Sequence, residues 1–142
     1  MRGGSLKRLA SWALLAAVLH SLWEIAQLPL YALWNEADRM RIVAYVAHCV
    51  AGDVLIATLT FLVVVAALRR LDWPQARPWR GGTLLVGLGL GYTVFSEWNN
   101  VYRAGAWSYA AQMPLVGGIG LTPLLQWLIV PAIMVVLAHR WR

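Results

Sequence analysis

Ionisable side chains interrupt the long apolar stretches of this chain. They comprise three carboxylic acids and two imidazoles: His20, Glu24, His48, Asp53 and Glu97. A charged side chain at the centre of a lipid bilayer costs about 2.5–3.5 kcal/mol on insertion scales. Residues that carry this cost usually mark a functional site, so these five side chains are the first candidates for one.

Metal binding is one chemistry that these residue types can perform. Imidazole and carboxylate ligands that project from facing helices commonly hold transition metals in helical bundles. The candidate ligands of a zinc or iron ion are His20, Glu24, His48 and Glu97, with Asp53 as a further ligand or as a base beside them. Haem is not expected, because His20 lies deeper in its apolar stretch than His48 and the two axial ligands of a haem need matched depth.

Acid–base catalysis is the second chemistry, and it needs no metal. Asp53 and Glu97 are suited to act as general acid and base on a small lipophilic substrate. Polar and aromatic residues near them form the candidate substrate pocket: Gln27, Asn100, Tyr102, Trp107, Tyr109 and Gln126. The sequence therefore predicts metal- or proton-dependent chemistry in a His/carboxylate pocket. It leaves enzymatic activity open, and the alternative is a non-catalytic accessory or assembly subunit of a larger membrane complex.

The composition is that of an integral membrane protein. Of 142 residues, 61% are hydrophobic and only 13% are charged, whereas about 25% are charged in soluble domains. The net charge of +6 comes from clusters of Lys and Arg at the ends of apolar stretches. This arrangement is typical of topology signals and contacts with lipid head groups, and it argues against nucleic acid as a partner. We expect membrane lipids around the protein, with a lipophilic small molecule or a larger complex as its partner.

Four stretches are long and apolar enough to cross a bilayer as helices. They cover about 10–34, 42–68, 82–102 and 121–139. We therefore predict an all-α integral membrane protein in which four transmembrane helices form one bundle and residues 1–142 make a single domain. The third stretch contains Gly87 and Gly91, a spacing of small residues that permits close approach of another helix.

Basic residues predict the orientation of the bundle. The N-terminus, the connection at 69–81 and the C-terminus carry most of the Lys and Arg residues. We therefore expect both termini on the cytoplasmic side of the cell (inner) membrane. The connection at 103–120 has a single basic residue and is rich in Trp, Tyr, Met and Gly. Because a solvated loop would be more polar, we expect an interfacial or re-entrant loop between the third and fourth helices.

Helical spacing predicts that the candidate residues converge. His20, Glu24 and Gln27 recur at i, i+4 and i+7, so they share one face of the first helix. Glu97 and Asn100 share a face of the third helix in the same way. With the expected orientation, most polar residues of the four stretches lie in the outer half of the membrane. The sequence therefore predicts one cavity that is reached from the external face.

Overall fold

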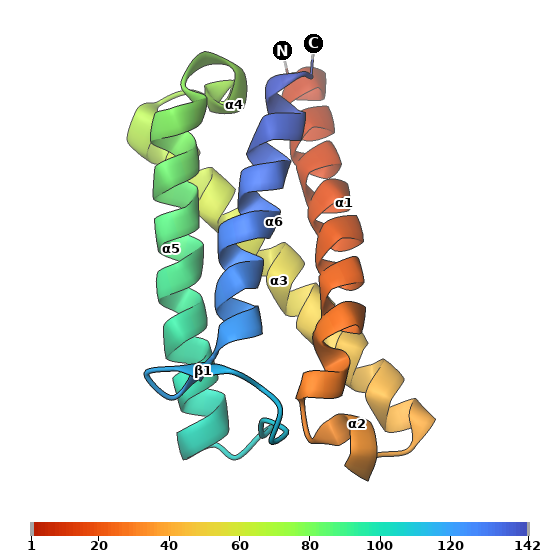
Figure 1. The fold of residues 1–142 in the computed structure, drawn as a ribbon. Coiled ribbons are helices and arrows are strands. Elements are labelled where there is room, and N and C mark those ends of the chain that lie inside the picture. Colours follow the sequence, from red (N-terminus) through yellow and green to blue (C-terminus); the bar gives the residue numbers. More distant parts are fainter. Residues whose placement is uncertain (1, 142) are drawn as a thin grey trace.

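The apolar stretches form long helices in the computed structural model, which describes residues 2–141 (Figure 1). The long helices are α1 (Arg2–Gln27), α3 (Arg39–Leu68), α5 (Pro78–Trp98) and α6 (Leu121–His139). They pack in the cyclic order α1, α3, α5, α6, and both termini lie at the same end of the molecule. The protein is therefore all-α, as predicted, apart from one small β-hairpin.

Within residues 2–141, three helical segments are long and apolar enough to cross a membrane: Gly4–Leu30, Arg39–Leu68 and Leu121–His139. Helix α5 is 21 residues long and lies beside them (Figure 1). It is not among the three apolar segments, and its sequence includes Arg80, Glu97 and several glycines. The structure thus supports the membrane-like character that the composition predicts.

The first apolar stretch is not helical as far as predicted. Pro29 lacks a backbone N–H and disfavours helical geometry at the residue before it, and α1 ends at Gln27. A 3₁₀ turn, η1 (Leu28–Leu30), and the short helix α2 (Leu33–Glu36) then lead the chain across the end of the bundle. The predicted range 10–34 is therefore not one continuous helix. It contains the C-terminal part of α1, the turn η1 and the start of α2.

Aromatic packing fills the end of the bundle that holds the termini. The short helix α4 (Trp73–Ala76) follows α3, and the buried ring of Trp73 lies 6.0 Å from the ring of Trp12 on α1. The indole N–H of Trp12 donates a 3.0 Å hydrogen bond to the carbonyl of Ala57 on α3. Because the one polar group of Trp12 is satisfied, its large ring is buried there without an unpaired donor.

Close packing between α5 and α6 depends on Gly89. A Cβ atom on Gly89 would lie 2.2 Å from the ring of Trp127 on α6. In contrast, a Cβ atom on Gly87 or Gly91 would meet no atom within 4 Å. Although the spacing of Gly87 and Gly91 permits close approach, no other helix in the described part of the chain packs closely there. Residues two positions from Gly89 lie on roughly the opposite side of the helix and point away from α6.

The connection between α5 and α6 crosses the end of the bundle that lies opposite the termini (Figure 1). It begins with a π-helical turn, η2 (Asn99–Arg103), and ends with the antiparallel strands β1 (Leu115–Val116) and β2 (Ile119–Gly120). In the middle, the backbone carbonyl of Ser108 accepts a 3.0 Å hydrogen bond from Ala32. The connection is thereby tied to the turn that follows α1.

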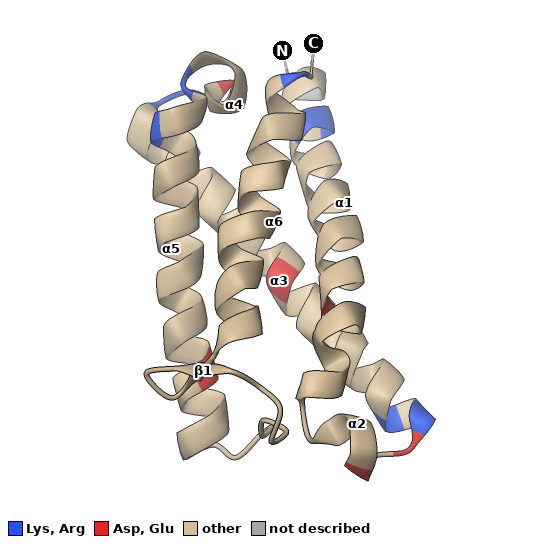
Figure 2. Ribbon diagram, in the orientation of Figure 1, with Lys and Arg blue, Asp and Glu red and all other residues tan. Residues whose placement is uncertain are grey.

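Charged residues are distributed unevenly over this fold (Figure 2). Most Lys and Arg residues lie at the end with the termini; the exceptions among the described residues are Arg39 and Arg41 at the start of α3 and Arg103 in η2. The acidic residues inside α1, α3 and α5 lie between the middle of the bundle and the opposite end. Basic and acidic side chains are therefore largely separated along the length of the molecule.

Candidate functional site

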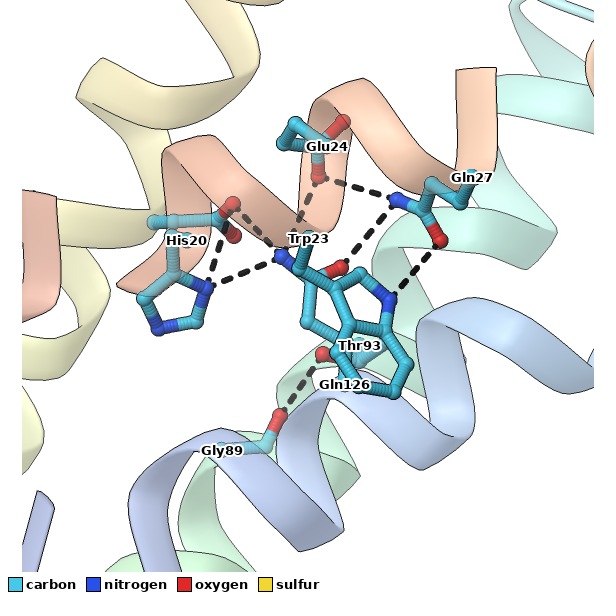
Figure 3. Close-up of polar contacts among 8 residues, drawn as sticks. His20, Trp23, Glu24, Gln27, Gly89, Thr93 and Gln126 are labelled. Atoms are coloured by element: carbon cyan, nitrogen blue, oxygen red, sulfur yellow. Dashed lines mark hydrogen bonds and ion pairs between the residues drawn. The ribbon is translucent and has the colours of Figure 1, made fainter. Parts of the chain in front are cut away.

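Gln126 on α6 is the centre of a buried hydrogen-bonded cluster (Figure 3). Its nitrogen Nε2 lies 2.9 Å from Nδ1 of His20, 3.1 Å from Oε1 of Glu24 and 3.0 Å from Oδ2 of Asp53. His20 and Glu24 belong to α1, and Asp53 belongs to α3. The i, i+4 spacing explains why His20 and Glu24 point in the same direction. Their contacts with Gln126 and Asp53 depend on how the three helices pack.

The side-chain amide of Gln27 on α1 fixes the orientation of the Gln126 amide (Figure 3). Its nitrogen donates to Oε1 of Glu24 at 3.0 Å and to Oε1 of Gln126 at 3.2 Å. Its oxygen accepts a 3.2 Å hydrogen bond from the indole N–H of Trp23. Because the oxygen of Gln126 is used in this way, its nitrogen is directed toward the two carboxyl groups.

His20 lies behind this cluster and has no exposed surface. Its ring packs against Trp127, with ring centroids 5.0 Å apart, and its Nδ1 lies 3.4 Å from Oδ2 of Asp53. The Gln126 amide has two protons and lies within hydrogen-bonding distance of three side-chain atoms, so it cannot donate to all three at once. The second ring nitrogen of His20 has no hydrogen-bond partner in the described part of the chain.

Glu97 on α5 is held by three aromatic donors. Its Oε2 accepts from the hydroxyl of Tyr109 at 2.6 Å, and from the hydroxyl of Tyr31 and the indole of Trp107 at 3.4 Å each. Tyr31 follows α1, whereas Trp107 and Tyr109 belong to the α5–α6 connection, so the paired loops create this arrangement. Burial, followed by the hydrogen bond to Glu97, raises the pKa of Tyr109, which keeps its hydroxyl protonated as a donor.

Glu24, Asp53 and Glu97 line one shared cavity of about 190 Å³. All four long helices contribute to its wall, as do the turn after α1 and the α5–α6 connection. Its surface combines the three carboxyl groups with aromatic rings: Tyr31, Tyr45, Tyr92, Trp107 and Trp127. The packing of the helices therefore brings carboxyl groups from α1, α3 and α5 to one cavity.

The structure brings together most of the residues that the sequence singled out. Those that line the cavity are Glu24, Gln27, His48, Asp53, Glu97, Asn100, Trp107 and Gln126. His20 contributes from behind the wall through its contacts with Gln126 and Asp53. Tyr109 contributes through its hydroxyl, which reaches Glu97. Tyr102 is exposed instead, and its hydroxyl donates to the carbonyl of Gly118 in the hairpin.

The sequence interpretation did not include several residues of the cavity wall. Tyr45, Cys49 and Gly52 recur at i, i+4 and i+7 on α3, so the spacing that identified the α1 residues applies to them as well. Tyr31 carries no such signal, because it follows the end of α1 and reaches Glu97 only through the turn. A loop residue of this kind becomes a candidate only when the fold is known.

The cavity reaches the surface of the bundle between α3 and α5. His48 on α3 is exposed, Tyr92 on α5 is 47% exposed, and both also line the cavity. Gly52 on the same stretch of α3 has open space where a side chain would be. The cavity is therefore accessible from the side of the bundle as well as being covered by the loops at its end.

No Lys or Arg side chain is among the cavity-lining residues in the described part of the chain. The carboxyl groups there accept hydrogen bonds from neutral donors on Gln27, Gln126, Tyr31, Trp107 and Tyr109. Within residues 2–141, no three His, Cys, Asp or Glu side chains are arranged to hold a metal ion. Zinc and iron therefore remain predictions from the sequence.

Comparison with known proteins adds no further constraint on this site. No family model matches the chain, and no curated protein and no solved structure is significantly similar to it. The function must therefore be argued from the residues of the cavity.

Proposed function

We propose that this protein is a multi-pass protein of the cell (inner) membrane that carries out proton-dependent chemistry on a small lipophilic substrate. The observation that carries the proposal is the convergence of Glu24, Asp53 and Glu97 on one cavity that no Lys or Arg of residues 2–141 lines. Carboxyl groups at membrane depth commonly serve in binding or in proton transfer. Proton exchange with a bound molecule is the chemistry that such groups perform without a cofactor.

In the proposed arrangement α5 crosses the membrane as a fourth span beside the three apolar helices. Its 21 residues are long enough to cross the hydrocarbon core. The basic residues at the end with the termini favour a cytoplasmic location for that end (Figure 2). The cavity then lies in the outer half of the bundle, and the aromatic α5–α6 connection lies at the external interface.

The two sides of the cavity are suited to opposite roles in proton transfer. Glu24 and Asp53 face the same nitrogen of Gln126. Like charges that close together are unfavourable, and a shared proton removes the repulsion, so this pair serves as the proton donor. Glu97 is oriented through one oxygen by three donors, which leaves its other oxygen to accept a proton from the substrate.

The side opening explains why a lipophilic substrate suits this site. A molecule dissolved in the bilayer reaches the carboxyl groups between α3 and α5, past His48 and Tyr92, without passing through water. The loops at the end of the bundle, which carry Trp107 and Tyr109, shield the same groups from the aqueous side. This combination favours chemistry on a membrane-dissolved molecule.

The experiment compares lipid extracts of cells that produce the protein with extracts of cells that lack it. Untargeted mass spectrometry should reveal a lipid-soluble compound whose amount changes when the protein is present. The change should disappear in Glu97→Gln and in Asp53→Asn, because each substitution keeps the shape of the side chain and removes its proton exchange. Glu36→Gln is the matched control, since Glu36 is exposed on α2 and remote from the cavity lining.

All variants should be compared at equal amounts of folded protein, measured by size-exclusion chromatography in a mild detergent. Extracts that are identical with and without the protein would overturn the proposal. The same conclusion would follow if Glu97→Gln and Asp53→Asn reproduced the wild-type extract. Loss of a co-purifying membrane protein in these variants, without any change in the extracts, would favour the accessory-subunit alternative.

A further inference from the structure

The charge balance of the cavity is the first observation that indicates a ligand. Three carboxyl groups line it, and no Lys or Arg side chain does so among the described residues. Each of the three is anchored to the protein through one oxygen: Oε1 of Glu24, Oδ2 of Asp53 and Oε2 of Glu97. Without a ligand, the proton shared by Glu24 and Asp53 limits the negative charge, and full ionisation of buried carboxyl groups requires a compensating cation. A positively charged ligand would supply that cation.

The aromatic wall is the second observation. The rings of Tyr31, Tyr45 and Trp107 line the cavity next to Glu97. Tyr45 lies 6.0 Å from Trp107 in an edge-to-face arrangement and 6.3 Å from Tyr31. Aromatic rings attract organic cations, and quaternary ammonium groups are commonly recognised in sites that several such rings line. The wall therefore favours an alkylammonium group over a compact hydrated ion.

Size and access provide the third observation. The cavity of about 190 Å³ is smaller than the roughly 300–1,000 Å³ of sites that enclose a whole drug-sized ligand. A head group fits, but the rest of a lipophilic molecule must leave through the opening between α3 and α5. The outer surface there is apolar. On α3, Leu55 follows His48 by seven residues on the same helix face and is 59% exposed. On α5, the ring of Phe95 lies 6.5 Å from that of Tyr92 and the residue is 58% exposed. A hydrocarbon chain would therefore pass directly into lipid.

We infer that the cavity binds the head group of a lipophilic ammonium compound, held by Glu24, Asp53 and Glu97 within the aromatic wall, while its hydrocarbon chain extends into the membrane between α3 and α5. The inference rests on the proposed function and deepens it, because it names the class of substrate.

The test uses the full-length protein in nanodiscs of phosphatidylglycerol, a lipid without an ammonium group, and measures equilibrium binding of radiolabelled decyltrimethylammonium. Empty nanodiscs provide the correction for partitioning into lipid. Two unlabelled competitors separate charge from shape: the neutral analogue, in which carbon replaces the nitrogen, and the anion decyl sulfate. We expect saturable binding of the ammonium compound and no competition by the neutral or anionic compounds.

Two substitutions test the residues involved. Glu97→Gln should weaken binding of the ammonium compound about tenfold or more, because it removes one buried charge of an ion pair. Tyr45→Leu should weaken binding about 2- to 30-fold through loss of the aromatic face, whereas Tyr45→Phe should bind like wild type. Tyr45 is a suitable position because its hydroxyl does not donate to Glu97 in the described structure.

Equal affinity for the ammonium compound and its neutral analogue would overturn the inference in the wild-type protein alone, whether or not a variant folds. Absence of saturable binding would overturn it too. If the wild-type protein changed the lipid extracts and Glu97→Gln abolished that change, while the ammonium compound did not bind, the proposed function would stand and only the substrate class would be wrong. Binding without any effect of the protein on lipid extracts would support the cationic ligand and contradict the catalytic role.

Discussion

Substitution of Gly89 by alanine tests the packing that supports the cavity. The new Cβ would lie 2.2 Å from Cε3 and 2.6 Å from Cζ3 of Trp127. Non-bonded carbon atoms are optimally about 3.5–4.0 Å apart, so the ring must move by more than about 1 Å. Trp127 is almost completely buried, and His20 lies against it with ring centroids 5.0 Å apart, so little space exists for that movement.

Overpacking of a well-filled core costs about 1–3 kcal/mol, and a clash with a rigid indole belongs at the upper end of that range. We therefore expect Gly89→Ala to lower the free energy of unfolding by about 3 kcal/mol. Gly87→Ala is the matched control, because it lies on the same helix and has no atom within 4 Å of the new Cβ. It should be neutral or stabilising by up to about 1 kcal/mol, since alanine is the better helix former.

The assay is equilibrium unfolding in mixed micelles of a mild and a denaturing detergent, followed by the loss of helical circular dichroism. The two variants differ in position by only two residues, so detergent effects should be shared between them. Equal stability of Gly89→Ala and Gly87→Ala would refute the packing of α5 against α6 described above. It would also remove the support for the position of Trp127 in the cavity wall.

Two further predictions concern the loop and the cavity. Tyr109→Phe should cost about 1.5–3 kcal/mol at neutral pH, because it removes a hydrogen bond to the carboxyl group of Glu97. The raised pKa of Tyr109 in the folded protein means that its stabilising contribution is complete below the unfolded value of about 10 and declines as the pH rises above it. The difference in unfolding free energy between wild type and Tyr109→Phe should therefore shrink above about pH 10, and a constant difference would contradict this reasoning. Cys49, the single cysteine, lines the cavity, so a cationic thiol reagent added outside intact cells should modify it faster than an anionic reagent of similar size. Equal rates, or modification only after the membrane is opened, would contradict an outward-facing cavity lined by carboxyl groups.

Helix positions were predictable because hydrophobicity and length determine them. The predicted stretch 121–139 has the same limits as α6, since Gly120 and Arg140 flank an apolar run. The stretch 10–34 differs from the observed helix because Pro29 ends α1 inside a run that remains apolar. Hydropathy alone does not indicate that a proline lacks a backbone N–H. The end of α1 follows from that missing donor and not from a change in hydrophobicity.

The shared helix faces were also predictable, but the contacts between helices were not. The i, i+4, i+7 spacing placed His20, Glu24 and Gln27 on one face, and all three do contact Gln126. That Gln126 is their common partner depends on the rotation of α6 about its axis. The packing of Trp127 against Gly89 accompanies this rotation, and the glycine spacing pointed to Gly87 and Gly91 instead.

The surroundings of Glu97 were the least predictable part of the site. Three donors converge on it from two loops, and their positions depend on the backbone pairing of Tyr31 with Tyr109. A pairing between residues far apart in the sequence leaves no periodic signal in either segment. The uncharged, aromatic composition of 103–120 indicated an unusual loop, but it did not indicate which carboxyl group the loop would contact.

A double-mutant cycle between Asp53 and Gln126 tests the central claim, that side chains from separate helices form one cluster around the cavity. Their side chains lie 3.0 Å apart although the residues are 73 positions apart in sequence. The free energies of unfolding of Asp53→Ala, Gln126→Ala and the double variant should reveal a coupling of about 0.5–3 kcal/mol, while Gln126→Ala combined with Glu36→Ala should be additive. Additive effects at Asp53 and Gln126, within about 0.3 kcal/mol, would show that the two side chains do not meet and would contradict the site on which the proposed function depends.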